Sequence, residues 1–493
     1  MKKQYILFIL TIFLVSSCEK LEIEYKNKPD IDRVLSEPDD VLQLTSSLFY
    51  NWYMTQTSSI SPQMSMWVMS DQGTSSWANS GMYHLSSEPR EEFNNTETYT
   101  YANIFERYWQ DLYGVLWQAN DILNVTANGM EIGEIDENGI GEDTKMVRAM
   151  SYFIQGVSLG YLGLVYDRAY IMTDGLESPD EIQLSPYKTV VDSAISSLEK
   201  CISVAGNNAF ELPPEWINGS EYTNTELMQL ANAFIARLSI YWPRTANENE
   251  LIDWNAVLTH AQNGIQRDLA PYMDNVTWKN WFFHYTVARD NWVRIDARII
   301  NLLDPNYPFR YPDDGINPGQ ASSDDERLES DFHYRSSCDF KPERGYYHFS
   351  NYELKRYPYN HSSPGDVVEF SVVEQDLFIA EAQLHIGNTS TAIDIINAGS
   401  RVTRGNIDPV STLASDEEVL YAIFYERDID LIMTGFGISF FDMRRRDMLQ
   451  NGTMLHFPIP ARELNVIGLP LYSFGGVDYA NGVGTSNGGW FPN

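Results

Sequence analysis

Apolar residues recur at steps of three and four over much of the 493-residue chain, and this spacing constrains the fold more than any other feature. It places apolar side chains on one face of an α-helix. Two such series comprise Tyr101, Phe105, Tyr108, Leu112, Val115, Ala119 and Ile122, and then Met146, Met150, Phe153, Val157, Tyr161 and Leu164. The alternation of apolar and polar residues that is typical of strands is scarce. We therefore predict a mainly α fold.

Helix start signals occur at three further positions. Ser185 precedes Pro186, which suits an N-cap followed by a proline in the first helical turn. Thr223 and Ser415 are each followed three positions later by a glutamate. This is the spacing of a capping box, in which each side chain accepts the backbone N–H of the other residue. Each signal predicts that a helix begins there.

The predicted helices form pairs. Over 373–403, two apolar stripes flank a turn with the small residues Ala380, Gly387 and Ala392 around it. Small side chains at such a turn let antiparallel helices approach closely. Looser pairs comprise 146–166 with 186–204, and 227–242 with 253–267. Together they indicate a scaffold of tetratricopeptide-type helix pairs.

Two long stretches, 54–98 and 268–365, lack helical periodicity. Irregular stretches of this length are unusual within a compact domain unless they are functional. Both mix large aromatic rings with hydroxyl, amide and carboxylate groups. The side chains of interest are Asp71, Trp77 and Asn79 in the first stretch, and Trp281 and Trp292 in the second. Trp52 and Trp109, by contrast, lie on helix-period faces, and we expect them in the core.

The amino terminus indicates export. Lys2 and Lys3 precede an apolar run over 6–15, which is the organisation of a secretory signal peptide and is too short to span a bilayer. Val15-Ser16-Ser17-Cys18 resembles a bacterial lipobox, in which the cysteine is lipidated and becomes the first residue of the mature chain. The alternative is an ordinary signal peptide with a chance cysteine. We expect a signal peptide over 1–17, a tether lipidated at Cys18 over 18–35, and one domain over 36–493.

Charge and cysteine content narrow the classes of function. With 68 acidic and 34 basic residues, the net charge of −34 argues against nucleic acid as a partner, because phosphate binding needs clustered cations. No later segment has 18 consecutive apolar residues, so we expect the lipid to be the only membrane attachment. Cys201 and Cys338 are expected to be unpaired thiols, since a secreted chain this poor in cysteine does not depend on disulfides.

The carboxyl-terminal part carries the residues of a family resemblance. These are Glu426-Arg427, Phe440-Phe441-Asp442-Met443-Arg444-Arg445, Phe457-Pro458-Ile459-Pro460 and Glu463-Leu464. Together with the lipobox and the helix pairs, they resemble the SusD/RagB family of outer-membrane nutrient-binding lipoproteins, most strongly over 370–465. The sequence departs from the family's pattern at Thr434 and Gly437, where an acidic residue and an arginine are usual.

The resemblance implies a SusD-like fold. Helices over about 36–53, 99–267 and 366–450 would form its scaffold, and the two irregular stretches would be ligand-binding insertions. It also implies a protein that is anchored in the outer membrane, faces the cell exterior and has no catalytic activity. Such a protein captures an oligosaccharide and passes it to a SusC-like TonB-dependent transporter.

Residue chemistry agrees with a sugar ligand. Aromatic rings stack on the apolar face of a pyranose, and amides and carboxylates bond its hydroxyls. The expected ligand contacts are Asp71, Trp77, Asn79, Trp281 and Trp292. Two alternatives stay open. One is peptide uptake by the same fold, because such rings bind peptides as readily; the other is a helical glycoside hydrolase, which needs two carboxylates about 5–10 Å apart across a cleft.

Three remaining motifs receive structural explanations. The string Gly156-Val157-Ser158-Leu159-Gly160 matches a nucleophile elbow, but it lies within a predicted helix and not at a strand-to-helix turn. Arg427 and residues 444–446 would suit phosphate or sulfate, but we expect them to pair with Glu426, Asp430 and Asp442. A Ca²⁺ ion would find oxygen ligands among Asp313, Asp314, Asp324, Asp325 and Glu326. Their spacing lacks EF-hand order, so we expect a solvated loop and predict neither a cofactor nor a metal site.

Overall fold

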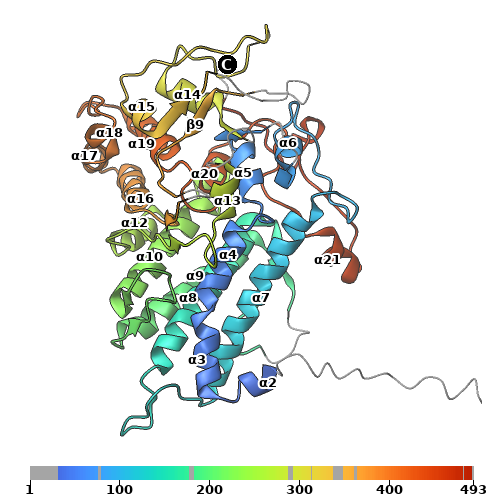
Figure 1. Cartoon of the computed structure of the whole chain (residues 1–493), viewed down its shortest axis with the longest axis vertical. Coiled ribbons are helices and arrows are strands. Elements are labelled where there is room, and N and C mark those ends of the chain that lie inside the picture. The colour runs from blue at the N-terminus through green and yellow to red at the C-terminus, as the bar shows by residue number, and fades with distance from the viewer. Residues whose placement is uncertain are drawn as a thin grey trace, which may run out of the picture.

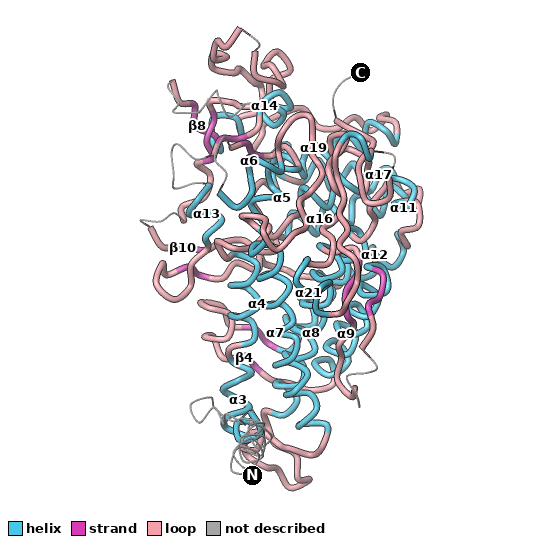
Figure 2. The backbone as a smooth tube through the Cα atoms, turned by 90° about the vertical axis from the view of Figure 1, so that its right-hand side faces the viewer, coloured by secondary structure: helices cyan, strands magenta, loops and turns pink. Residues whose placement is uncertain are grey.

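The computed structural model describes residues 31–75, 79–176, 182–286, 293–312, 314–336, 348–359, 363–480 and 482–490. Within these ranges the chain is mainly helical, as the apolar spacing predicted (Figure 1). Its strands form short two-stranded antiparallel ribbons, which are small beside the helices in Figure 2.

The amino-terminal half supplies most of the scaffold. Its helices are α2 (Ile31–Val34), α3 (Pro38–Ser46), α4 (Leu48–Thr57), α7 (Ala102–Ala127), α8 (Thr144–Val165), α9 (Tyr187–Gly206), α10 (Asn224–Tyr241), α11 (Ala246–Asn249) and α12 (Trp254–Gln262). Two ribbons accompany them, β2 (Arg168–Tyr170) with β3 (Leu184–Pro186), and β4 (Glu211–Leu212) with β5 (Tyr222–Thr223). Both long apolar series lie on single helices, α7 and α8, and Trp52 and Trp109 are core residues as expected.

The carboxyl-terminal part completes the scaffold. It contains α16 (Val372–His385), α17 (Thr389–Ala398), α18 (Ser400–Thr403), α19 (Asp416–Asp430), α20 (Ile438–Arg444), α21 (Ala461–Val466) and the 3-10 helix η4 (Val477–Tyr479). The three predicted helix pairs are present, because α8 packs on α9, α10 on α12, and α16 on α17. In the described part of the chain, no helix is both long enough and apolar enough to cross a bilayer.

Glycines let α8 approach its partners. A Cβ on Gly156 would lie 2.6 Å from Leu198 of α9, and one on Gly160 would lie 2.8 Å from Leu238 of α10. Real side chains do not tolerate such distances, so only glycine permits this packing. The string that resembles a nucleophile elbow is therefore explained by helix packing inside α8.

The helix boundaries follow local chemistry, with one exception. The capping boxes of Thr223 and Ser415 are both formed. The α16–α17 turn is a Schellman motif on Gly387, whose φ is +86°. The helix predicted at Ser185 is present as α9, but Ser185 is not its N-cap: Ser185 lies in β3, and Pro186 stands at the N-cap. The helix begins one residue later than this assignment required, at Tyr187, and Ser185 precedes the cap as a strand residue paired with Ala169 of β2.

Both insertions contain more structure than the sequence suggested. The first holds α5 (Gln63–Met69), β1 (Gly73–Thr74), η1 (Asn79–Gly81) and α6 (Met82–Leu85). The second holds β6 (Tyr272–Met273), α13 (Trp281–Thr286), β7 (Arg294–Ile295), α14 (Ala297–Leu303), α15 (Arg327–Asp331), β8 (Phe332–Tyr334) and β9 (Tyr352–Leu354), and β10 (Gly365–Asp366) closes it. These elements are too short to leave a helical period in the sequence.

The two insertions are joined to each other. β1 pairs with β7 in antiparallel register, with Gly73 opposite Ile295 and Thr74 opposite Arg294. The ribbon continues at one end, where the Asp296 N–H donates to the Gln72 carbonyl at 2.9 Å. Segments that are distant in the sequence therefore form one body at the upper end of Figure 1, where α5, α6 and α14 lie.

Arginines of the carboxyl-terminal motif are internal, as expected. Arg427 and Arg445 each form ion pairs with Glu381 and Asp442 at 2.5–3.1 Å, whereas Arg444 donates to backbone carbonyls. Asp442 is thus a confirmed partner. The other two expected carboxylates, Glu426 and Asp430, pair with Arg327 and Arg356.

Candidate functional site

A pocket of about 410 Å³ lies between α4, α7 and α13. Trp281, one of the predicted ligand contacts, begins α13 and lines this pocket. Met54 and Thr55 of α4 and Ser58 at its C-cap also line the pocket, and the other lining residues are Asn51, Asp111, Gly114, Val115 and Gln118. This Trp281 pocket therefore lies between the scaffold and the second insertion.

Polar side chains line the pocket beside the Trp281 ring. The side-chain amide of Asn51 on α4 donates to Oε1 of Gln118 on α7 at 3.2 Å, which links the two helices. Asp111 is partly exposed and forms an i,i+4 ion pair with Arg107 at 2.9 Å. Amide, hydroxyl and carboxylate groups thus stand near an indole ring, which is the mixture that a sugar requires.

Gly114 keeps one side of the pocket open. It is an exposed residue in the interior of α7, where glycine is less favourable than alanine by about 1 kcal/mol. A Cβ built at this position meets no atom within 4 Å, so helix packing does not require the glycine. A longer side chain would therefore extend into open space at the pocket.

The Trp281 ring is surrounded by residues of α13 and by the two residues that precede this helix. The Asn280 side chain accepts the Phe283 N–H at 3.0 Å, which fixes the first turn of α13, and Phe283 is buried. The Lys279 ammonium lies 4.0 Å from the centre of the indole ring, and the Tyr285 ring lies 5.7 Å away at a 24° inclination. Trp281 is half-buried, so a ligand would meet the part of the ring that its neighbours leave exposed.

Asp71, which is predicted as a ligand contact, does not line the Trp281 pocket. Its side chain is buried and accepts hydrogen bonds from Arg90 at 3.0 Å, Gln450 at 2.8 Å and the Trp490 indole at 2.6 Å. Its backbone has a φ of +49°, which turns the chain between α5 and β1. These partners draw the carboxylate inward, so the described structure does not present it to a solute.

Beside Asp71 lies a buried group of acids around His348. Nε2 of His348 lies 2.7 Å from Glu88 Oε1, and its Nδ1 lies 3.5 Å from Asp296 Oδ1. Burial alone would lower the pKa of His348, but the carboxylates of Asp296, Glu88 and Asp71 outweigh it and raise this pKa to about 10. Burial raises the pKa of Asp296 to about 7 despite the neighbouring imidazole. No pattern in the sequence indicated this group, because its members are far apart along the chain.

The remaining predicted contacts lie outside the described residues. These are Trp77, Trp292 and the side chain of Asn79, and the lipidation site Cys18 is also outside. Thr74 and Arg294, the nearest paired residues of the two segments that carry the tryptophans, lie opposite each other in the β1–β7 ribbon. Cys201 is a buried free thiol, and Cys338 is outside the described ranges.

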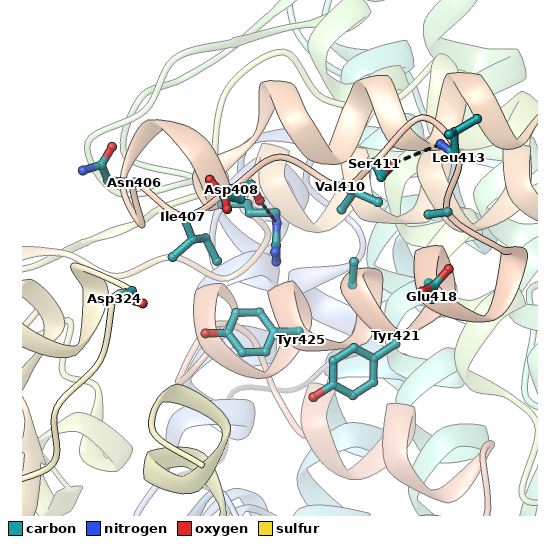
Figure 3. A pocket seen from close by; sticks show the side chains of 13 residues that line it. Asp324, Asn406, Ile407, Asp408, Val410, Ser411, Leu413, Glu418, Tyr421 and Tyr425 are labelled. Carbon is teal, nitrogen blue, oxygen red and sulfur yellow. Dashed lines mark hydrogen bonds between the residues drawn. The ribbon is translucent and has the colours of Figure 1, made fainter. Parts of the chain in front are cut away.

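A larger pocket, of about 910 Å³, lies on the carboxyl-terminal helices (Figure 3). Tyr421 and Tyr425 of α19 line it from one side, and the loop that carries Asn406, Asp408 and Leu413 lines it from the other. The Tyr421 side chain is 62% exposed, whereas the Tyr425 hydroxyl donates to Asp325 at 2.8 Å. We call this the Tyr421 pocket. The i,i+4 spacing of the two tyrosines was the signal available in the sequence.

The acidic stretch considered for Ca²⁺ is partly engaged by protein groups. Asp325 is buried and forms an ion pair with Arg327 at 2.8 Å, and Asp324 lines the Tyr421 pocket. Asp314 accepts the Ile316 N–H at 2.9 Å, and Asp313 lies outside the described residues. Asp325 is thus not part of a solvated loop, because Arg327 fixes it in the interior.

Comparison with known proteins adds the fold family. No protein-family model matches the sequence, and no curated protein matches it significantly. Among solved structures, the chain is similar to a SusD-like carbohydrate binding protein from Bacteroides fragilis, with a TM-score of 0.60 and 14% identity over 84% of this chain and 86% of that one. A SusD superfamily protein from Parabacteroides distasonis gives a TM-score of 0.59 and 14% identity over 87% and 97% of the two chains.

A SusD-like carbohydrate binding protein from Bacteroides vulgatus is a third similar structure. Its TM-score is 0.54 and its identity is 15%, over 83% of each chain. At identities this low the likeness shows the fold alone, and it extends over most of the chain. The chain therefore has a SusD-like fold, as the resemblance of its motifs implied.

Proposed function

We propose that this protein is a cell-surface lipoprotein that binds an oligosaccharide and passes it to a SusC-like TonB-dependent transporter in the outer membrane. The observation that carries the proposal is the SusD-like fold, which it shares with structures named as carbohydrate binding proteins. The lipobox at Cys18 supports anchoring by an N-terminal lipid on the outer face of that membrane.

The Trp281 pocket is the proposed place of binding. Its volume of about 410 Å³ lies in the range of about 300–1,000 Å³ that small-ligand sites usually have. The Trp281 ring would stack on the apolar face of a sugar ring, while Asn51, Asp111 and Gln118 would bond its hydroxyls. Open space at Gly114 would admit a chain of several sugar units along α7.

The other predicted contacts take different parts in this proposal. Trp77, Asn79 and Trp292 remain proposed ligand contacts on the strength of their sequence alone. Asp71 is proposed to act indirectly, because its hydrogen bonds to Arg90 and Gln450 hold the first insertion in place. It is no longer proposed to touch the sugar.

Binding without catalysis suits the Trp281 pocket. A glycoside hydrolase needs two carboxylates across its cleft. Among the residues that line this pocket, Asp111 is the single carboxylate. The Tyr421 pocket differs, because Asp324, Asp408 and Glu418 all line it, and this is the place where the hydrolase alternative has chemical support.

A binding screen tests the proposal. The full chain with Cys18→Ala would be titrated with panels of oligosaccharides and of oligopeptides, and product formation would be followed in parallel. Saturable binding of a glycan without turnover is the expected result. Binding of peptides alone would establish the peptide alternative, and glycan cleavage that Glu418→Gln abolishes would establish the hydrolase.

A further inference from the structure

Three buried side chains place atoms that can bind a metal ion close to one another. Asp71, Asp296 and His348 each contribute one such atom, and these atoms all lie within 4.8 Å of one another. The exposed fractions of the three residues are 3%, 1% and 2%, so bulk water does not solvate the group. They come from both insertions, since Asp71 precedes β1 and Asp296 follows β7.

The spacing of the three atoms suits a shared ion. Nδ1 of His348 lies 3.5 Å from Asp296 Oδ1 and 3.8 Å from Asp71 Oδ1. Ligands bound to one Zn²⁺ at about 2.0–2.1 Å in tetrahedral geometry lie about 3.4 Å apart. A small contraction of the group would therefore bring the three atoms to the separation of zinc ligands, with a fourth position left for water.

Other side chains contact these residues and would orient them as outer-shell partners of a bound metal ion. A histidine that binds a metal through one ring nitrogen usually directs its other ring N–H to a carboxylate, which fixes the ring. Glu88 Oε1 stands 2.7 Å from Nε2 of His348, on the side of the ring away from the two aspartates. Gln450 and Trp490 donate to Oδ2 of Asp71, which leaves its Oδ1 toward His348 and Arg90.

Charge around the three side chains also favours a cation. Asp71, Asp296 and Glu88 surround one imidazole, and two nearby arginines already pair with carboxylates of this group. Arg90 pairs with Asp71 at 3.0 Å, Arg310 with Glu88 at 2.9 Å, and Arg298 with Asp428 at 2.8 Å. Buried carboxylates need compensation by a cation, which the imidazolium of His348 supplies without metal and which a metal ion would supply in place of its proton.

We propose that Asp71, Asp296 and His348 bind a divalent transition metal of the Zn²⁺ type that fastens the two insertions together. One imidazole with two carboxylates is a donor set that zinc accepts, whereas Ca²⁺ takes oxygen ligands. The ion would close the end of the β1–β7 ribbon at which the Asp296 N–H bonds the Gln72 carbonyl. This inference does not depend on the proposed glycan.

Metal titration of chelator-treated full-length protein tests the site. ZnCl₂ uptake would be measured by calorimetry and by elemental mass spectrometry, with CaCl₂ as the comparison ion. We expect one Zn²⁺ per chain, little binding of Ca²⁺, and a higher melting temperature with Zn²⁺ by mass action. His348→Gln and Asp296→Asn should each abolish this uptake, and Glu88→Gln should weaken it by about 10-fold or more as an outer-shell change.

Controls separate the proposed site from adventitious metal. His385→Gln removes a partly exposed histidine that stacks on Trp254, and it should leave Zn²⁺ uptake unchanged. Should the ligand variants fail to fold, the Co²⁺-loaded wild-type protein provides the answer through its absorption spectrum. Intense d–d bands of a low-coordinate N/O site support the proposal. It is overturned by a spectrum of hydrated cobalt, by absence of uptake, or by uptake that His348→Gln and Asp296→Asn leave intact.

Discussion

Trp281 and Gly114 line the same pocket, although one begins α13 in the second insertion and the other lies within α7 of the scaffold. The ring offers a stacking surface, and the glycine leaves space beside it. The two residues come together only in the folded chain. Substitutions of each therefore test the proposed function.

Replacing Trp281 by alanine should weaken glycan binding roughly five- to ten-fold, since a stacked ring contributes about 1 kcal/mol or more. The ring is half-buried, so the unfolding midpoint should change little. Calorimetric titration with the glycan found in the screen measures the effect. Trp117→Ala is the matched control, because Trp117 is 50% exposed on α7 and does not line the pocket. A loss caused instead by Tyr421→Ala would move the site to the Tyr421 pocket.

Two substitutions of Gly114 should separate an effect on stability from an effect on glycan binding. Gly114→Ala should stabilise α7 by about 0.5–1 kcal/mol, because alanine is the better helix former and no atom obstructs its Cβ. Gly114→Leu should keep that stability but fill part of the pocket, and thus weaken glycan binding. Urea unfolding and calorimetry on the two proteins separate the effects. Undiminished binding by the leucine variant would show that the sugar lies elsewhere.

Cys18→Ala should release the protein from the membrane, because the proposed anchor is a lipid on that residue and the described helices include none that could cross a bilayer. Fractionation of cells that express each form, with detergent-phase partitioning, measures this. Wild-type protein should partition with the membrane and the variant with the soluble fraction. Membrane attachment that survives the substitution would contradict a lipid anchor at Cys18.

Acid should weaken the fold through Asp442. Burial opposes ionisation of this carboxyl, but the guanidinium groups of Arg446, Arg445 and Arg427 outweigh it and hold the pKa of Asp442 below its usual range. A group with a lowered folded-state pKa stabilises the protein above its unfolded pKa of about 3.9, and this contribution is lost as the pH falls through the folded value. Urea midpoints at pH 7, 5 and 3 should therefore decline most between pH 5 and 3. In Asp442→Asn the midpoint should be lower at pH 7 and its decline smaller; an equal decline in both proteins would assign it to other carboxylates.

Arg237 should be among the residues most costly to remove. It is fully buried and forms ion pairs with Glu374 at 2.6 Å and Glu369 at 3.1 Å. Arg237→Met leaves two carboxylates without their cation, which costs about 3–5 kcal/mol in comparable sites. Arg267→Met is the control, because its ion pair with Glu226 is partly exposed and worth about 0–1 kcal/mol. Equal losses of unfolding free energy in the two variants would refute this ranking.

Helical structure is local, and the class of fold could therefore be predicted from the sequence. Residues at steps of three and four on α7 and α8, the capping boxes of Thr223 and Ser415, and the turn at Gly387 each act within a few positions of the chain. Side chains whose role depends on such neighbours, including Trp52 and Trp109 in the core, were therefore predictable.

Which polar side chains face a pocket and which face one another depends on contacts that form only on folding. Asp71 has the same chemistry whether it is exposed or buried, and contacts with Arg90, Gln450 and Trp490, all distant in the sequence, draw it into the interior. The pocket around Trp281 likewise depends on helices that meet only after folding. Contacts between residues far apart in the chain leave no period or spacing in a single sequence, and for that reason no pattern could have predicted them.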